Sequence, residues 1–418
     1  MSIRGRAIGI AAGVLGVAGA TASAVAYQRV QTQAAQDEPA PRPRPAGDQP
    51  QGPPPRRPRP APRKAAPRRD VARAAEPGAD GDPNLLFGGE HDAEDGELFG
   101  TLRGHVLNVV TDDGIDLHVE VDEPDPDRVV DPDLTVVLVH GFTLNQDSWH
   151  FQREHLRGRV RTVLLDQRSH GRSARSEPDR CTIEQLGRDL ARVVETAAPG
   201  PVVVVGHSMG GMGVISMATQ FPEMLGTKVV GVGLVATTAG GLDPGRILFP
   251  LAPLGAVGAS AVNRAIRVLD RGRPLVDRLR AANLGFARRM TERYSFGDTV
   301  PRNWAEFVFD MIDATPFEVI AAFYPAFATL DHFEDLEVMG RVPVTVVGGT
   351  EDRLTGIGHQ RKLHARIPGS VLHEAHGAGH MVLMERHDDV NRELDLLISR
   401  AGGLARHNGR SRRPGRVG

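Results

Sequence analysis

Short runs of consecutive apolar residues recur along residues 101–400. They cover residues 134–139, 160–165, 202–205, 229–235 and 342–347, and a shorter run follows at 371–374. Continuous apolar runs of this length are typical of parallel strands that are covered on both faces. They therefore predict a buried sheet.

The two runs before these strands have a different pattern. Residues 106–110 and 115–121 are rich in β-branched residues and flank Asp112-Asp113-Gly114. Because Asp-Gly between such runs favours a tight turn, this segment predicts a β-hairpin.

Helical patterns lie between the strands. Thr182 has the position of a helix cap, and the residues after it place Leu186, Leu190 and Val193 on one helical face. Alternation of strands and helices over about 300 residues predicts an α/β open sheet, in which ligands bind at the C-terminal ends of the strands.

Composition limits the kind of protein. The 418 residues are 40% hydrophobic and 24% charged, which is ordinary for a globular chain. The single cysteine, Cys181, excludes a disulfide framework and a cysteine-built zinc site. The 16 histidines show no metal-binding spacing, so we expect no metal and no cofactor.

Charge divides the chain into three parts. The net charge of −2 combines 13 basic and 6 acidic residues in 1–80, six arginines and no acid in 400–418, and therefore −15 in residues 81–399. An acidic body between basic ends indicates tails with a separate role. We expect no nucleic-acid partner for the body.

The ends of the chain predict segments outside the folded domain. Residues 1–30 are rich in Ala and Gly after a basic start. This fits either a signal peptide, cleaved after Ala22-Ser23-Ala24 or Ala24-Val25-Ala26, or an uncleaved anchor. Residues 31–100 are Pro/Arg-rich and then acidic, and residues 401–418 are basic; we expect both to be disordered. The expected location is thus the cell envelope or a membrane, in unresolved orientation, with membrane contact through residues 7–28 and the basic linker.

A candidate nucleophile follows the strand at 202–205. The sequence Gly206-His207-Ser208-Met209-Gly210 stands between this strand and an apolar helical stretch. In G-x-S-x-G a sharp turn exposes the serine, and glycines avoid clashes around it. A serine hydroxyl is a weak nucleophile, so Ser208 requires a base and an acid downstream.

Both groups occur in the expected order. Asp352 follows the strand at 342–347, with Glu351 and Asp335 as competitors for the acid. His380 lies in a glycine-flanked loop after the strand at 371–374, with His376 and His373 as competitors for the base. We favour Asp352 and His380 by their positions, and we interpret His140, His170 and His207 as packing residues of loops. The backbone N–H of Met209 can stabilise a developing oxyanion, with a second donor from the loop after strand 134–139.

These motifs resemble the α/β-hydrolase family, in its serine esterase and lipase-like branch, and especially actinobacterial members with an Ala/Gly-rich N-terminal segment. The resemblance covers residues 101–400. It rests on His140-Gly141-Phe142, on residues 166–173, on residues 206–211 and on the Asp352/His380 pair.

The resemblance implies a mostly parallel, eight-stranded sheet flanked by helices. It implies Ser208 as nucleophile, His380 as base, Asp352 as the orienting acid, and the N–H groups of Phe142 and Met209 as oxyanion donors. One departure is Ser169, where the family usually has glycine, which puts the conformation of that loop in question.

Residues 237–335 interrupt the strand pattern and hold nine of the 14 phenylalanines, the ninth being Phe333 at the edge of this range. We expect a mainly helical cap over the site, with an apolar pocket for a small hydrophobic ester or thioester. A carbon–carbon bond hydrolase, a perhydrolase and a non-catalytic ligand-binding protein of the same fold remain alternatives.

Overall fold

A computed structural model describes residues 99–242 and 288–411. All the predicted strands are present, the hairpin included, with ends that differ from the apolar runs by one or two residues. The strands are β1 (His105–Val110), β2 (Asp116–Asp122), β3 (Thr135–Val139), β4 (Arg161–Leu165), β5 (Val202–His207), β6 (Val229–Val235), β7 (Val344–Gly349) and β8 (Val371–Ala375).

The strands form one eight-stranded sheet in the order β1-β2-β4-β3-β5-β6-β7-β8. The β1–β2 and β2–β4 pairs are antiparallel, and the other pairs are parallel. The expected mostly parallel sheet is therefore confirmed, with its antiparallel part at the edge that the hairpin forms.

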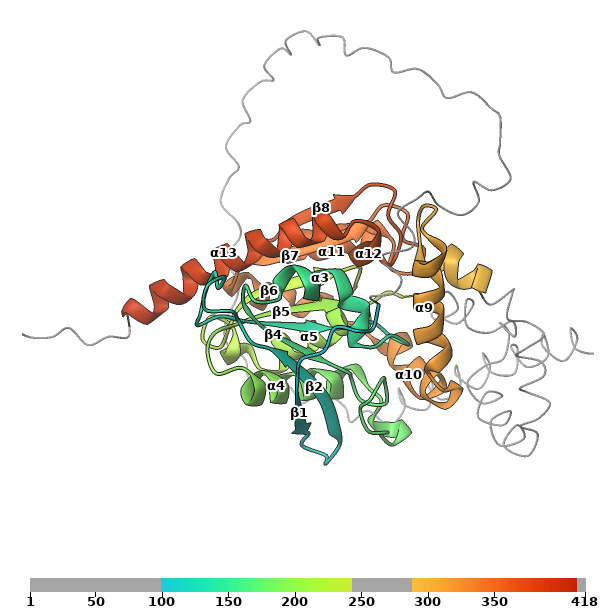
Figure 1. Cartoon of the computed structure of the whole chain (residues 1–418), viewed down its shortest axis with the longest axis horizontal. Helices are drawn as coiled ribbons and strands as arrows, with labels where there is room; N and C mark the ends of the chain where they lie inside the picture. The colour runs from blue at the N-terminus through green and yellow to red at the C-terminus, as the bar shows by residue number, and fades with distance from the viewer. Residues whose placement is uncertain (1–98, 243–287, 412–418) are drawn as a thin grey trace, which may run out of the picture.

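Helices cover both faces of this sheet (Figure 1). One face is covered by α3 (His150–Leu156), α12 (Val382–Glu385) and α13 (His387–Ser411). The other face is covered by α4 (Ile183–Ala197), α5 (Met209–Gln220), α11 (Ile357–Arg366) and the 3-10 segment η4 (Phe333–Arg341). The described residues also form α9 (Arg302–Ala314), α10 (Phe317–Thr329) and the 3-10 turns η1 (Gln146–Trp149), η2 (Pro178–Arg180) and η3 (Pro222–Met224).

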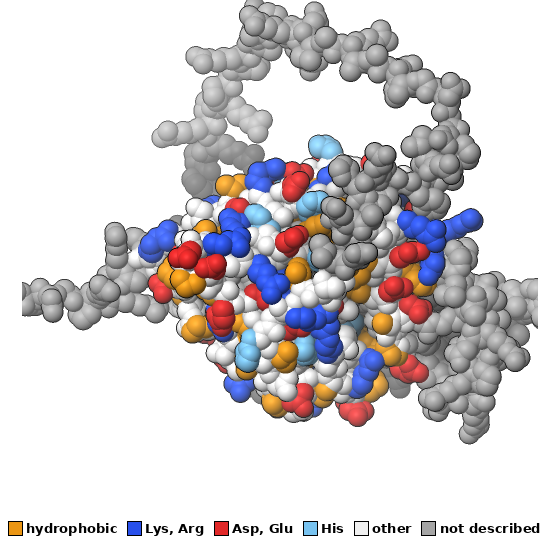
Figure 2. Space-filling view, viewed as in Figure 1, with side chains coloured by type: hydrophobic (Ala, Val, Ile, Leu, Met, Phe, Trp, Pro, Cys, Tyr) orange, Lys and Arg blue, Asp and Glu red, His pale blue; other side chains and the backbone are white. Residues whose placement is uncertain are grey.

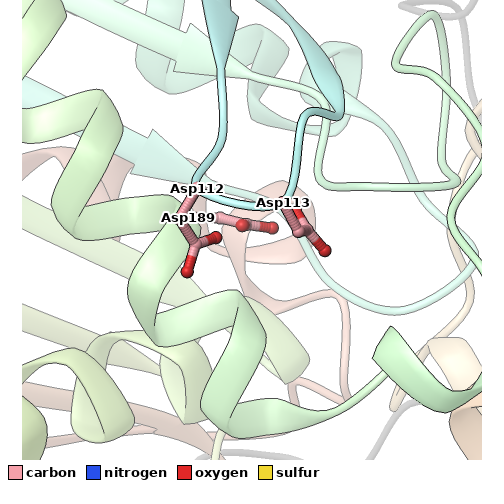
Figure 3. A group of neighbouring side chains, drawn as sticks. All are labelled: Asp112, Asp113 and Asp189. Carbon is pink, nitrogen blue, oxygen red and sulfur yellow. The ribbon is translucent and has the colours of Figure 1, made fainter.

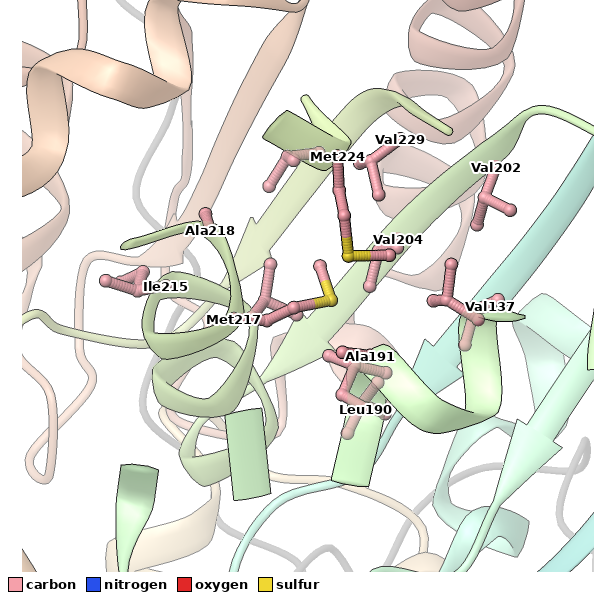
Figure 4. Packing of buried hydrophobic residues seen from close by; sticks show 14 of the residues in the cluster. Val137, Leu190, Ala191, Val202, Val204, Ile215, Met217, Ala218, Met224 and Val229 are labelled. Atoms are coloured by element: carbon pink, nitrogen blue, oxygen red, sulfur yellow. The ribbon is translucent and has the colours of Figure 1, made fainter. Parts of the chain in front are cut away.

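The two-sided cover explains the continuous apolar runs. Along β3, Val137 packs into the core under α4 and α5, whereas Val136 and Leu138 pack into the core under α3 and α13. Successive side chains of a strand point to opposite faces, so both faces must be apolar. On the α4–α5 side, Met217 reaches towards Val204 of β5 (Figure 4).

The predicted helix after Thr182 is confirmed as α4. Its cap is Thr182, whose hydroxyl oxygen accepts a hydrogen bond from the backbone N–H of Gln185 at 3.1 Å. This bond satisfies one of the first-turn N–H groups that have no partner within the helix.

The expected end of the domain at residue 400 differs from the structure. Helix α13 continues to Ser411, and Arg406 forms an ion pair with Asp131 at 3.1 Å. The buried apolar stripe of α13, which includes Leu397 and Ala401, carries the helix past the expected boundary. Residues 412–418 of the expected basic tail lie outside the described residues.

The described part of the expected cap is helical. It comprises a helical stretch at 288–295 together with α9 and α10, which lie at the end of the molecule opposite the projecting end of α13 (Figure 1). Residues 243–287 of the cap, the N-terminal segment 1–30 and the linker up to residue 98 lie outside the described residues. Across residues 99–242 and 288–411, the helices are too short or too polar to cross a bilayer.

The surface of the body mixes both signs of charge. On the face seen in Figure 2, acidic and basic side chains lie interspersed. The acidic excess of the body is therefore not gathered into one patch on this face.

Candidate active site

Ser208 stands at a strained turn between β5 and α5. Its backbone has φ 52° and ψ −119°. Residues other than glycine rarely adopt this backbone conformation, which costs about 1–3 kcal/mol. The Ser208 N–H donates to the Val235 carbonyl of the neighbouring strand at 2.9 Å, which holds the turn in place. The strand–turn–helix context predicted from the sequence is confirmed.

The glycines around Ser208 are required by close packing. A Cβ at Gly206 would lie 2.5 Å from the backbone of Gly210, and a Cβ at Gly210 would lie 2.3 Å from the Val139 carbonyl oxygen. The first contact lets the chain reverse into α5. The second lets α5 pack directly on the end of β3.

His380 and Asp352 reach Ser208 from two other strand ends. The Nε2 atom of His380 lies 2.9 Å from Ser208 Oγ, and its Nδ1 atom lies 2.9 Å from Asp352 Oδ2. Asp352 follows β7 and His380 follows β8. In this arrangement the Asp352 carboxylate accepts the Nδ1 proton, which leaves Nε2 free to accept the Ser208 hydroxyl proton.

Asp352 is held as a carboxylate by more than His380. Its Oδ1 accepts the N–H groups of Leu354 and Thr355, each at 2.8 Å, and the Thr355 hydroxyl lies 2.8 Å from Oδ2. Burial raises the pKa of Asp352, but the charge and hydrogen bond of His380 and the bonds from Thr355 outweigh it. The net effect is a pKa below the usual value.

The competing acids and bases lie elsewhere. Glu351 is exposed, and Asp335 lies in η4, with its carboxylate 3.9 Å from His332. His376 is exposed, and His373 faces Asp389 and Glu393 at 3.6 Å. Of the candidates that the sequence left open, the structure brings Asp352 and His380 to Ser208.

Three further histidines are buried around the site and carry lowered pKa values. Burial lowers the pKa to about 4 for His140 and to about 3 for both His170 and His207, the charge of a neighbouring histidine adding to the effect for the last two. His140 Nε2 accepts the Gln167 N–H at 2.9 Å, which fixes its proton on Nδ1. His207 Nε2 donates to the His380 carbonyl at 3.0 Å. These neutral rings support the loops.

The expected oxyanion donors occupy two facing backbone segments. Met209 is the first residue of α5, and Phe142 lies in the turn after β3. Gly141, which precedes Phe142, approaches Ser208 so closely that a Cβ there would lie 3.1 Å from Ser208 Cβ. A first-turn N–H has no partner within its helix, so Met209 presents a donor beside Ser208.

A cavity of about 70 Å³ opens above Ser208 and His380. Its wall is largely apolar and comes from both the sheet body and the described cap segments. The lining includes Phe142, Leu144, Met212, Leu242, Thr291, Tyr294, Ser295, Val308, Ile312, Phe327, Leu354 and Met381. Of the cap phenylalanines, Phe327 reaches this cavity, whereas Phe249 and Phe286 lie outside the described residues.

The loop with the unusual Ser169 keeps a left-handed backbone at that position. Ser169 has φ 67°, and its hydroxyl oxygen accepts the Ser176 N–H at 3.0 Å. The serine therefore adopts the conformation that glycine adopts readily, and gains a hydrogen bond in return.

One group of acids in the described residues has the spacing of a metal site: Asp112, Asp113 and Asp189 (Figure 3). The guanidinium of Arg168 lies among them and bonds Asp189 at 2.6 and 2.7 Å and Asp113 at 2.8 Å. Arg168 occupies the space between Asp113 and Asp189, and Arg188 lies 3.5 Å from Asp112. The group therefore ties the hairpin and α4 to the loop after β4.

The sheet order and the turn at Ser208 are those of the α/β-hydrolase fold, which is the class of this protein. The chain belongs to the alpha/beta hydrolase family, whose sequence profile matches residues 136–393.

Relatives and solved structures agree with this assignment. An uncharacterized protein of Mycobacterium tuberculosis is 27% identical over 65% of this chain and 76% of its own. An uncharacterized hydrolase of Bacillus subtilis, YugF, is 25% identical over 62% of this chain and 88% of its own. A thermophilic esterase from Thermogutta terrifontis is similar in fold, with a TM-score of 0.55 and 23% identity, over 72% of this chain and all of that one.

The sequence interpretation missed residues that contact the triad candidates. Thr355 bonds both oxygens of Asp352, and its position three residues after the acid, typical of a side-chain turn, could have indicated it. Tyr294 and Thr291 line the cavity, but no local pattern distinguishes them.

Proposed function

We propose that this hydrolase cleaves small hydrophobic carboxylic esters or thioesters through an acyl-enzyme on Ser208. One observation carries the proposal. A hydrogen-bonded chain runs from Ser208 Oγ to His380 Nε2 and from His380 Nδ1 to Asp352 Oδ2, with both distances 2.9 Å. Ser208 and His380 line an apolar cavity.

This hydrogen-bonded chain supports nucleophilic attack by Ser208. His380 Nε2 takes the hydroxyl proton as Oγ bonds to the acyl carbon, and Asp352 stabilises the imidazolium that forms. His380 then gives that proton to the leaving alcohol or thiol as the acyl–oxygen or acyl–sulfur bond breaks. In the second half, His380 takes a proton from water as the water oxygen bonds to the acyl carbon. The bond between the acyl carbon and Ser208 Oγ then breaks, His380 returns the proton to Oγ, and the carboxylic acid leaves.

The developing oxyanion is assigned to the N–H groups of Met209 and Phe142. The α5 N-terminus at Met209 adds a favourable dipole for negative charge. Donors placed in this way typically contribute about 10²–10³ in rate each.

The cavity supports a compact apolar acyl group. Its volume of about 70 Å³ and its lining by residues such as Leu144, Met212 and Val308 favour short chains and disfavour charged ones.

A fluorophosphonate probe tests the nucleophile. We expect stoichiometric labelling of the wild type and none of Ser208→Ala. Ser216→Ala is the matched control, because Ser216 is a buried serine of the same α5 helix outside the cavity. Equal labelling of the wild type and Ser208→Ala would show that Ser208 is not the nucleophile.

A panel of p-nitrophenyl esters from acetate to longer chains tests the substrate class. We expect kcat/KM to be highest for short acyl chains and lower for charged ones. Preference for charged esters would contradict the apolar pocket. Labelling of Ser208 without ester hydrolysis would favour the carbon–carbon or perhydrolytic alternative, and absence of labelling would favour a ligand-binding role.

The composition of residues 1–30 supports a proposal on location: export, or retention at a membrane by this segment. N-terminal sequencing of the protein from cells separates the two. A start at Met1 or Ser2 in the membrane fraction indicates an anchor, and a start near Val25 or Tyr27 indicates cleavage. Intact protein in the soluble cytoplasmic fraction would overturn both.

A further inference from the structure

Glu385 is a buried carboxylate that no step of the proposed reaction uses. It ends the short helix α12, five residues after His380, and is 8% exposed. Its two oxygens bond to different parts of the chain. Oε1 accepts the Gly379 N–H at 2.7 Å, and Oε2 accepts the N–H groups of Gly297 at 2.8 Å and Asp298 at 3.4 Å.

The two segments joined by Glu385 are in direct backbone contact. A Cβ at Gly379 would lie 2.4 Å from the Gly297 nitrogen, and a Cβ at Gly297 would lie 2.3 Å from the Gly377 oxygen. The Met381 N–H also donates to the Ser295 carbonyl at 2.7 Å. The loop that carries His380 is therefore fixed on both sides of the histidine to residues 295–298.

The same cap segment is bonded to the loop of the acid. Arg353, next to Asp352, donates to the carbonyls of Phe296 at 2.9 Å and Arg293 at 2.7 Å. Thr291, Tyr294 and Ser295 of this segment line the cavity. Residues 291–298 thus contact the substrate cavity on one side and the supports of Asp352 and His380 on the other.

A carboxylate suits the position of Glu385 because backbone donors converge on both of its oxygens. A glutamine of the same shape would turn its NH₂ group towards one of these N–H donors and leave that donor unpaired. The neighbouring charges are Arg386 and Asp298, whose side chains lie 3.9 Å apart. Burial raises the pKa of Glu385, and the backbone N–H bonds and Arg386 oppose this only in part.

We propose that Glu385 is a positioning residue for the reaction: it holds His380 against Ser208 through Gly379 and couples that loop to the cap segment that lines the cavity. This inference rests on the proposed roles of Ser208 and His380. Glu385 does not touch the reacting atoms, so it acts on the rate only through the placement of His380.

The test uses the full chain and compares Glu385→Gln with Glu393→Gln. Glu393 is a buried carboxylate on α13 away from the cavity, so its variant controls for removal of a buried charge. The rate constant and the end point of fluorophosphonate labelling are measured separately. We expect Glu385→Gln to lower the rate constant about 10- to 100-fold with an end point near one label per chain. For Glu393→Gln we expect the rate constant and the end point of labelling to equal those of the wild type.

Steady-state kinetics with a short p-nitrophenyl ester give a second readout. For Glu385→Gln we expect kcat per labelled site to fall in parallel with the labelling rate, while KM changes less than about threefold. A merely structural role would instead lower the end point and leave the rate constant per active site unchanged, which would overturn the inference.

Glu385→Asp keeps the test decisive if the glutamine variant folds poorly. Asp retains the charge but is shorter by about 1.5 Å, so it reaches only one of the two segments. We expect its labelling rate to fall about 3- to 10-fold. If both variants react as fast as the wild type, the role of Glu385 is wrong and the proposed function still stands. If the wild type shows no Ser208-dependent labelling, the proposed function fails as well.

Discussion

Two regions of the molecule bury a carboxylate against a basic side chain, and they do different work. Asp352 contacts His380 through one oxygen at 2.9 Å. Asp189 contacts Arg168 through both oxygens, at 2.6 and 2.7 Å, and Asp113 binds the other edge of the same guanidinium. Asp352 and Arg168 both lie in loops that follow strands, whereas Asp189 lies in α4, so burial of an acid near a strand end does not by itself distinguish the two regions.

The partner of the carboxylate makes the difference. Arginine keeps its charge at every accessible pH and offers a rigid fork of donors, so the Arg168 pair can fix a loop but cannot carry a proton between reactants. Histidine gains and loses a proton near neutral pH, so a carboxylate that holds it supports acid–base chemistry. Burial of an acid therefore indicates a site only together with what the acid holds.

Asp352→Asn should produce the largest effect on activity. The amide keeps the shape of the side chain but no longer accepts the His380 Nδ1 proton, so the histidine presents the wrong tautomer to Ser208. We expect kcat for a p-nitrophenyl ester to fall about 10⁴-fold, with little change in the unfolding midpoint. A fall of less than about tenfold would show that another acid orients His380.

Asp189→Asn should lower the stability of the fold and leave the activity nearly unchanged. Removing one partner leaves the buried Arg168 charge poorly compensated, which typically costs about 3–5 kcal/mol of the free energy of unfolding. We expect a lower midpoint in urea and kcat per labelled site within about threefold of the wild type. If activity fell as it does for Asp352→Asn at unchanged stability, the contrast between the two regions would not hold.

The pH dependence of stability should reveal the three buried neutral histidines around the site. The folded pKa values of His140, His170 and His207 are about 4, 3 and 3, below the value of about 6.5 in an unfolded chain. Between these values the unfolded state binds more protons, so the free energy of unfolding falls as pH falls from about 6.5 towards 4. The slope is about 1.4 kcal/mol per pH unit for each histidine.

Buried Asp166 and Glu385, whose pKa values burial raises, oppose part of this loss. Urea unfolding at a series of pH values measures the net slope. His170→Asn keeps a donor for the Arg168 carbonyl but does not titrate, so its slope should be smaller by about one proton. An unchanged slope would show that His170 is protonated in the folded state.

Ser169→Gly should give the smallest effect. Glycine removes the strain of a left-handed backbone at residue 169, which stabilises the folded state by about 1 kcal/mol. The substitution also removes the hydrogen bond from the Ser176 N–H, which costs about the same. We expect the free energy of unfolding to change by less than about 1 kcal/mol, with kcat unchanged. A large loss of activity would show that this loop acts on the site directly.

Much of this protein follows from its sequence alone. The strands, the hairpin and the α4 cap are local patterns, because side-chain alternation and turn chemistry act over a few residues. The Gly-x-Ser-x-Gly turn is local as well, so Ser208 was identifiable before the fold.

The tertiary structure decided what depends on distant residues. Ser208 and His380 are 172 residues apart, and the sheet places the ends of β5, β7 and β8 along one edge. The sequence favoured Asp352 and His380 by position, but only the folded chain shows that these two, and not Glu351 or His376, make the 2.9 Å contacts of the site. The packing of α13 beyond residue 400, through Ala401 and the Arg406–Asp131 ion pair, and the contacts of Glu385 depend on surfaces contributed by other segments. Local sequence determines which element forms, whereas the packing of elements determines which side chains meet.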